Sequence, residues 1–174
     1  KKPSPIKVQS EATSADVETA GAEKLKPDVK EAFRLKFGLE IYEGYGATET
    51  TPVASVNMPN ILDPDTLKEF SFNKVGSVGM SLPGTIIKIV DLNTLGELPV
   101  GEDGLILIGG GQVMKGYLND PEKTAEVIAE LDGVRYYKTG DKGHIDENGF
   151  VTIVDRYSRF AKIGGEMISL GAVE

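Results

Sequence analysis

The sequence predicts an α/β segment followed by a mostly antiparallel β segment. A helical pattern over residues 27–37 is followed by an alternating strand over residues 39–43 and then by a glycine-rich loop, which is the order typical of α/β folds. From residue 75 onward the pattern changes to short apolar strands that are separated by turns. The chain also contains 21 glycines among 174 residues, gathered in short loops, as is usual for strand-rich domains.

The α/β segment is expected over residues 21–74, after a polar and irregular N-terminal edge at residues 1–20. Pro27 suits the first turn of a helix, and apolar side chains follow it at helical spacing. Gly38 then predicts a left-handed cap at the end of the helix. The strand LEIYE leads directly into the glycine-rich loop, and α/β folds commonly bind ligands at such strand ends.

The β segment is expected over residues 75–155. Its strands are expected at residues 85–90, 105–108, 134–138 and 150–154. The sequence DENG predicts a hairpin turn before the last of them, and TGD predicts a turn after residue 138.

A single helix is expected to interrupt these strands, over residues 120–131. Asn119 or Asp120 would cap it, and Pro121 would lie in its first turn. The preceding side chains, Tyr117 among them, are expected to pack beneath the helix.

Composition excludes several classes of site. The chain has 27 acidic and 19 basic residues, and an acidic surface disfavours nucleic acid as a partner because that affinity depends on cationic phosphate contacts. With no cysteine there is no disulfide, thiol nucleophile or structural zinc site, and one histidine excludes a two-histidine metal site. The sequence shows neither a long apolar run nor a signal-peptide pattern, which argues against a membrane protein. The cysteine-free and acidic composition favours a cytoplasmic location for this chain.

The segment EGYGATETTP at residues 43–52 contains the side chains best suited to binding a ligand or to catalysis. The Walker A and dinucleotide-binding glycine patterns are absent, as is the serine of a nucleophile elbow. Glycines on both sides of Tyr45 would let the backbone approach a ligand, while its ring could cover a flat base. Thr48 offers a hydroxyl for phosphate oxygens, and Glu49 offers a hard oxygen suited to Mg²⁺. The alternative is a turn between strands that binds nothing.

EGYGATET closely resembles the Y-G-x-T-E motif of the adenylate-forming enzymes, which include acyl-CoA synthetases, luciferases and peptide-synthetase adenylation domains. Further segments resemble other motifs of this superfamily in the same order: GAEKLKPDVKEAF, GSVGMSLPGTIIKIVD, GELPVGEDGLILIGG, GYLNDPEKTAEVI and YYKTGDKGHIDENGFVTIVDR. The resemblance covers residues 21–174. It implies the end of an α/β subdomain, the β-subdomain of the large domain, and a hinge at residues 156–174. The family's phosphate loop and lysine-bearing C-terminal domain are expected outside this chain, which alone is expected to be inactive.

The resemblance implies a nucleotide site that binds ATP or AMP with Mg²⁺. Tyr45 would stack on the adenine, Thr48 would contact the α-phosphate and Glu49 would coordinate the metal. Asp141 would accept both ribose hydroxyls, and Arg156 would reach the ribose or a phosphate. The backbone that would line the adenine is that of Gly21, Ala22 and Glu23.

The resemblance implies further roles for four residues. Gly44 and Gly46 would border the acyl chain, so that bulk at Gly46 would intrude on its carboxyl end. Asp155 and Ser158 would belong to the hinge, where Ser158 replaces the more usual acidic residue or lysine.

The implied activity is AMP-forming ligation of a fatty acid to a thiol. The carboxylate attacks the α-phosphate of ATP, and a phosphopantetheine thiol of acyl carrier protein or coenzyme A then takes the acyl group. The segment DRYSRFAKIGGEMISLGAVE more narrowly resembles the acyl-carrier-protein synthetase part of bifunctional 2-acylglycerophosphoethanolamine acyltransferases. In such a protein, associated with the inner membrane, a separate domain would acylate a lysophospholipid. The alternatives are a long-chain fatty acyl-CoA synthetase and a non-catalytic nucleotide- or acyl-binding module.

Overall fold

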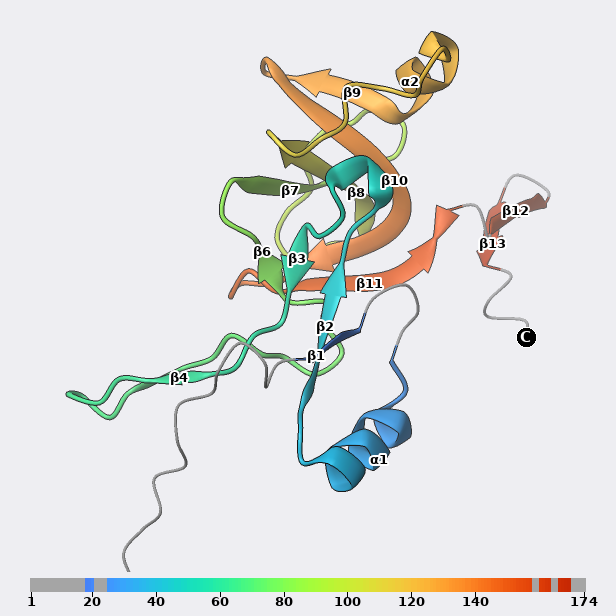
Figure 1. Ribbon diagram of the computed structural model, residues 1–174. Coiled ribbons are helices and arrows are strands. Elements are labelled where there is room, and N and C mark those ends of the chain that lie inside the picture. Colours follow the sequence, from blue (N-terminus) through green and yellow to red (C-terminus); the bar gives the residue numbers. More distant parts are fainter. Residues whose placement is uncertain (1–17, 21–24, 158–159, 164–165, 170–174) are drawn as a thin grey trace, which may run out of the picture.

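The computed structural model describes residues 18–20, 25–157, 160–163 and 166–169, with side chains over residues 25–157 (Figure 1). Two sheets, one of four strands and one of five, organise this part of the chain, and it contains few helices. No helix in the described residues is long and apolar enough to cross a membrane.

The first sheet contains a single β-α-β unit. Its four strands run in the order β1 (Glu18–Ala20), β2 (Ile41–Tyr45), β3 (Ser55–Val56) and β6 (Met80–Ser81). Strands β1 and β2 are parallel, and the remaining pairs are antiparallel. Strand β1 therefore lies in the segment that was expected to be irregular, because pairing with β2 supplies the order that its polar sequence does not indicate. In the described residues, the α/β character is confined to this unit.

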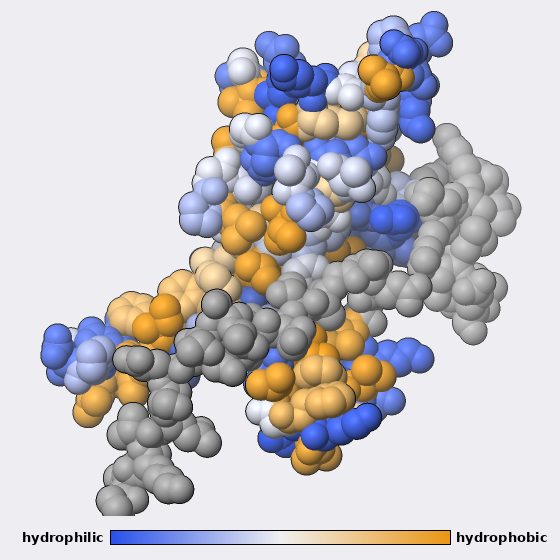
Figure 2. All heavy atoms as spheres, in the orientation of Figure 1, coloured by the Kyte–Doolittle hydropathy of each residue, from blue (hydrophilic) through white to orange (hydrophobic). Residues whose placement is uncertain are grey.

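The helix α1 (Pro27–Phe37) joins β1 to β2 and has the bounds that the sequence predicts. Gly38 ends it in the left-handed region at φ 70°, and the Gly38 N–H donates to the carbonyl of Arg34 at 2.8 Å. The helix buries none of its residues, and Val29 and Phe37 are 49% and 54% exposed. Figure 2 shows hydrophobic side chains gathered over this lower part of the molecule.

The second sheet is antiparallel and contains the core. Its strands run in the order β11 (Val151–Arg156), β10 (Val134–Ile145), β8 (Gly104–Gly110) and β7 (Thr85–Val90), and β9 (Ile128–Leu131) also pairs with β10. Strand β8 is buried on both faces: Ile106 and Ile108 pack in one apolar cluster, while Leu105 and Leu107 pack in another. Alternation along the strand thus gives the sheet a core on each side.

The expected helix over residues 120–131 is shorter in the structure. Helix α2 (Pro121–Val127) is capped by Asp120, whose side chain accepts the N–H of Lys123 at 3.0 Å, and the chain then continues directly as β9. Asp132 and Gly133 both have positive φ angles, of 52° and 74°. This two-residue turn favours hairpin pairing of β9 with β10, which outweighs the helical spacing of the apolar residues before it.

Two small hairpins lie outside the two sheets. Strands β4 (Ile61–Leu62) and β5 (Glu69–Phe70) form an arm that extends away from the sheets in Figure 1. Strands β12 (Phe160–Ile163) and β13 (Glu166–Ser169) pair near the C-terminus.

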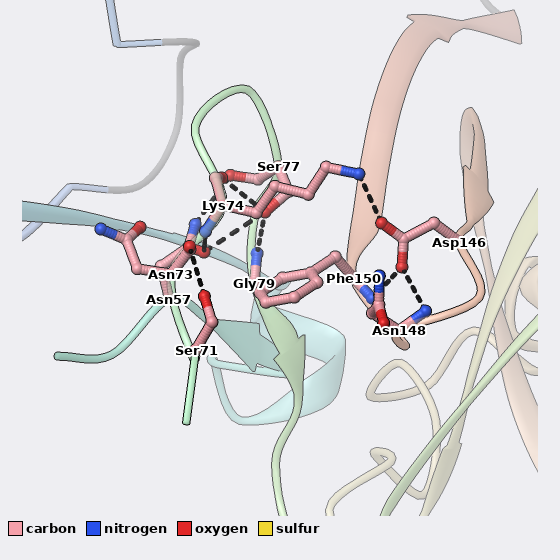
Figure 3. A network of polar contacts seen from close by, with 9 residues as sticks. All are labelled: Asn57, Ser71, Asn73, Lys74, Ser77, Gly79, Asp146, Asn148 and Phe150. Atoms are coloured by element: carbon pink, nitrogen blue, oxygen red, sulfur yellow. Dashed lines mark hydrogen bonds and ion pairs between the residues drawn. The ribbon is translucent and has the colours of Figure 1, made fainter. Parts of the chain in front are cut away.

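The two sheets are joined where the segment before β6 meets the start of β11. The Val78 N–H donates to the Val151 carbonyl at 2.8 Å, and the Val151 N–H donates to the Gly79 carbonyl at 2.9 Å. A polar network surrounds this contact (Figure 3). In it, the buried Asn57 donates to the Ser77 carbonyl at 2.8 Å, and Lys74 forms an ion pair with Asp146.

Replacing Gly79 with alanine is expected to lower the free energy of unfolding by about 3 kcal/mol or more. Gly79 has φ +83°, and an added Cβ would lie 1.9 Å from the carbonyl carbon of Val56. Left-handed backbone costs about 1–2 kcal/mol in a residue with a side chain, and overpacking adds about 1–3 kcal/mol. The measurement is urea unfolding of the chain.

Gly76 provides the matched control, because it has φ +84° but an added Cβ would meet nothing within 4 Å. Gly76→Ala is expected to cost only about 1–2 kcal/mol. Equal losses in the two variants would show that the close approach of Gly79 to Val56 has no energetic weight.

The ion pair of Lys74 with Asp146 is expected to make stability depend on acid pH. Burial raises the pKa of Asp146, but hydrogen bonds from Lys74 and from two backbone N–H groups outweigh it, so the folded-state pKa lies below its usual value. The stabilisation is therefore present above about pH 3.9, the ordinary pKa of aspartate, and is lost as pH falls through the lower folded-state pKa. At neutral pH it should be about 1 kcal/mol or less, because Lys74 is half-exposed.

Urea titrations from pH 7 to pH 2 of the wild type and Asp146→Asn would measure this dependence. Asparagine keeps an oxygen for the N–H groups of Asn148 and Phe150 but loses the charge. The stability difference between the two proteins is expected to shrink as pH falls below 3.9. A difference that stays constant down to pH 2 would contradict the expectation.

Candidate functional site

A buried carboxylate within one strand brings together the ends of two others. Tyr45 ends β2, Arg156 ends β11, and Asp141 lies within β10. The Tyr45 hydroxyl donates to Asp141 Oδ2 at 2.6 Å, and Arg156 Nε donates to Asp141 Oδ1 at 2.7 Å. Asp141 is only 5% exposed. Three of the residues predicted from the sequence therefore meet in one cluster, although Tyr45 and Asp141 are 96 positions apart in the chain.

The backbone at Asp141 differs from the expected turn between two strands. Strand β10 is continuous over Val134–Ile145, and its register with β8 shifts between Lys138 and Lys142. Gly140 takes φ 76° at this irregularity. The structure therefore accommodates the TGD sequence as a bulge, which bends the strand while keeping it paired on both sides.

The hydroxyl of Thr139 holds the backbone of the bulge. The Thr139 hydroxyl accepts the Asp141 N–H at 3.0 Å and donates to the Ile106 carbonyl at 2.9 Å. The Asp141 carboxylate is thereby free to bond Tyr45 and Arg156. Sequence reasoning did not assign Thr139 to the site, although its place in the TGD sequence could have indicated it.

The charges in this cluster support one another. Burial raises the pKa of Tyr45, and the negative charge of Asp141 and the hydrogen bond to it raise it further, so Tyr45 stays protonated as a donor. The hydrogen bond to Asp141 also raises the pKa of Arg156. A carboxylate offers about four acceptor positions, of which these two bonds use two. Each oxygen of Asp141 can thus accept one more hydroxyl.

The loop after β2 is held in shape by its own short contacts. It includes the 3-10 turn η2 (Thr48–Thr50), in which the fully buried Thr50 hydroxyl accepts the Ala47 N–H and donates to the Ala47 carbonyl, both at 3.0 Å. Thr48 is exposed at the start of this turn. A Cβ added to Gly46 would lie 1.8 Å from the Pro52 carbonyl oxygen.

This contact explains structurally why residue 46 is a glycine, and the explanation differs from the acyl-chain role implied by the sequence resemblance. The loop folds back on itself, so any side chain at Gly46 would collide with Pro52 before it could meet a substrate. Gly44 lies within β2, where it pairs with Val56 of β3.

Glu49 is bound by a residue that sequence reasoning did not assign to the site. The Tyr117 hydroxyl donates to Glu49 Oε1 at 2.6 Å, across 68 positions of sequence. Tyr117 had been expected to pack beneath the helix, and its place in the GYLND segment gave no signal of a partner. Burial raises the pKa of Tyr137, and the negative charges of Glu49 and Asp141 both add to this rise.

The oxygen atoms around Glu49 fit a cation that is bound partly by the protein and partly by phosphate oxygens. In the described residues no group of three or more metal-ligating side chains occurs. Mg²⁺ is commonly held by one or two carboxylates together with substrate phosphates, and Glu49 supplies one carboxylate. The exposed hydroxyl of Thr48 lies next to it in η2.

Four predicted site residues lie outside the described residues: Gly21, Ala22, Glu23 and Ser158. Asp155 precedes Arg156 in β11 and pairs with Lys142 of β10. Its proposed part in a hinge stays a prediction.

Comparison with known proteins gives matches over nearly the whole chain. The family model described as AMP-binding enzyme matches residues 2–118. A 4-coumarate–CoA ligase of Pinus taeda is 35% identical over 98% of this chain and 30% of its own length. A probable 4-coumarate–CoA ligase 2 of Dictyostelium discoideum is 35% identical over 98% of this chain and 29% of its own. The chain thus spans about a third of the length of these curated relatives.

Solved structures agree with this assignment. Apo MatB from Rhodopseudomonas palustris superposes with a TM-score of 0.68 at 33% identity, covering 88% of this chain and 28% of MatB. A long-chain-fatty-acid–CoA ligase from Archaeoglobus fulgidus gives a TM-score of 0.66 at 29% identity, covering 81% of this chain and 28% of the ligase.

These comparisons confirm the broad resemblance and give no support to the narrow one. The curated relatives are CoA ligases, so they do not support a bifunctional acyltransferase as the nearest kin. The family model matches more than half of the chain, and the superposed structures share its fold. The chain belongs to the family of AMP-binding enzymes and corresponds to part of the large domain of an adenylate-forming enzyme.

Proposed function

We propose that this chain is the nucleotide-binding part of an AMP-forming ligase that joins a carboxylic acid to the thiol of coenzyme A. The relatives named above carry this activity in their names, and the chain shares about a third of their length. Asp141 would bind the ribose of ATP and AMP, Tyr45 would cover the adenine, and Arg156 would reach the ribose or a phosphate. Thr48 and Glu49 would lie at the phosphates.

The observation that carries the proposal is the state of the Asp141 carboxylate. It is buried, ionisable and held by one donor on each oxygen, from Tyr45 and from Arg156. A carboxylate held in this way keeps one acceptor position on each oxygen, a geometry suited to two adjacent hydroxyls. If Asp141 had only a structural role in its strand, its carboxylate would accept hydrogen bonds from nearby backbone N–H groups. The carboxylate of Asp146 does so with the N–H groups of Asn148 and Phe150.

The residues of the site would act mainly by positioning and by charge. The acid carboxylate would attack the α-phosphate of ATP, and pyrophosphate would leave. Mg²⁺, when bound with ATP, would neutralise charge on the phosphates. Thr48 would offer a hydroxyl to the α-phosphate, while Glu49 would hold its carboxylate toward the metal. Preorganised donors of this kind supply much of the rate enhancement where side chains do no covalent chemistry.

A second candidate is the acyl-carrier-protein synthetase of a bifunctional 2-acylglycerophosphoethanolamine acyltransferase. The sequence DRYSRFAKIGGEMISLGAVE favours it, and its substrate would be a fatty acid. The two candidates differ in the thiol that accepts the acyl group. Full-length enzyme assayed with coenzyme A and with phosphopantetheinylated acyl carrier protein, each with long-chain fatty acids and with 4-coumarate, would separate them.

Asp141→Asn in the full-length enzyme is expected to weaken AMP binding by about 10-fold or more. Asparagine keeps one acceptor oxygen but loses the charge and the second acceptor, and bonds to a charged group are worth about 1.5–3 kcal/mol each. AMP affinity would be measured by calorimetry, and the melting temperature would be measured on the same sample. Burial of Asp141 beside Arg156 also predicts some loss of stability.

Asp146→Asn is the matched control, since it makes the same chemical change in the same strand hairpin without touching the site. Its AMP affinity is expected to equal that of the wild type. Unchanged AMP affinity in Asp141→Asn, together with a lower melting temperature, would show that Asp141 serves the fold and would reject the proposed nucleotide site.

A further inference from the structure

The Glu49 carboxylate is held from both its backbone and its side chain. It lies in the turn η2, whose shape is fixed by the buried Thr50. The Glu49 carbonyl accepts the Met114 N–H at 2.8 Å, and its carboxylate oxygen Oε1 accepts the Tyr117 hydroxyl at 2.6 Å. In the described residues, Tyr117 is the donor to this carboxylate and bonds only Oε1. The other oxygen, Oε2, therefore keeps its acceptor positions.

Tyr117 is itself fixed in place by helix α2. Its N–H donates to the Thr124 hydroxyl at 2.9 Å, and that hydroxyl donates to the Asp120 carbonyl at 2.8 Å. The Nζ of Lys123 lies 4.7 Å from the centre of the Tyr117 ring. A Cβ on the preceding Gly116 would lie 2.8 Å from Thr124 Cγ2, so glycine is needed for this approach. The position of the hydroxyl is thus set by several independent contacts.

The direction of the hydrogen bond is also fixed. A phenol has an ordinary pKa of about 10, and an ionised carboxylate can only accept hydrogen bonds. The phenol therefore stays protonated near neutral pH and acts as a donor. Such a donor restricts the rotation of a carboxylate without adding charge that would compete with a cation.

We propose that Tyr117 is a positioning residue, which holds the Glu49 carboxylate so that Oε2 is presented to the divalent cation bound with ATP. This inference rests on the proposed function, in which Glu49 is the metal-binding carboxylate. Residues that orient a metal ligand commonly contribute 10- to 100-fold to metal affinity. A purely structural role would instead tie the segment before α2 to the loop after β2 and would affect stability alone.

The test compares Tyr117→Phe, Glu49→Gln and wild type in the full-length enzyme. Mn²⁺ affinity would be measured by electron paramagnetic resonance with a non-hydrolysable ATP analogue bound, and AMP affinity would be measured without metal. Tyr117→Phe is expected to weaken Mn²⁺ binding roughly 10-fold, while AMP affinity stays at the wild-type value. The Mg²⁺ concentration that gives half-maximal pyrophosphate exchange should rise by a similar factor.

Tyr42→Phe is the matched control, because it removes a phenol from a nearly buried position in the same strand as Tyr45 but outside these contacts. Its Mn²⁺ affinity is expected to equal that of the wild type. Thr124→Val provides a second route to the same effect, since it removes the acceptor of the Tyr117 N–H and leaves both Glu49 and the phenol present. It should weaken Mn²⁺ binding in the same direction.

The outcomes separate this inference from the proposed function. Weaker Mn²⁺ binding in both Glu49→Gln and Tyr117→Phe supports the positioning role. Weaker binding in Glu49→Gln with wild-type binding in Tyr117→Phe overturns the positioning role and leaves Glu49 as the metal ligand. Wild-type Mn²⁺ binding in both variants overturns the positioning role and also the proposed part of Glu49.

Discussion

The burial of the Asp141 carboxylate is the constraint on which the site depends. A carboxylate at 5% exposure is costly to remove from water unless charged or hydrogen-bonding partners replace the solvent. Those partners come from the end of β2 and the end of β11, through Tyr45 and Arg156. Both strand ends must therefore be in place before the carboxylate can be buried at acceptable cost. The bulge in β10, held by Thr139, turns the carboxylate toward them.

A second contact ties the loop after β2 to the antiparallel part of the chain. Tyr45 and Glu49 are four positions apart, and each forms a 2.6 Å hydrogen bond with a residue far along the sequence, Asp141 and Tyr117 respectively. Between these two anchors, Gly46 allows the backbone to pass against Pro52. The loop is consequently fixed at both ends and in its middle. Such a loop can present Thr48 and Glu49 in one arrangement, so that ligand binding requires little further loss of conformational entropy from these residues.

Local sequence rules predicted the elements that local physics controls. Helix α1 and strand β7 have the predicted bounds, because Pro27, Gly38 and the run TIIKIV carry their own start, stop and alternation signals. Helix α2 was predicted to end four residues too late, since Ile128 and Ala129 fit both a helix face and a strand. Pairing with β10 across the Asp132–Gly133 turn decided between them. Strand β1 was missed for a similar reason, because its polar residues become a strand only beside β2.

The sequence by itself determined the family and the residues that are proposed to carry the chemistry. The types and spacing of Tyr45, Thr48, Glu49, Asp141 and Arg156 indicated the family, and the comparisons confirm the family. Only the tertiary structure decided how these residues are held. The partners of Asp141 and Glu49, the backbone role of Thr139 and the collision that reserves position 46 for glycine all arise between segments distant in sequence or folded back on one another. Hydrogen bonds and close contacts depend on distances of tenths of an ångström, which spacing along a chain does not specify.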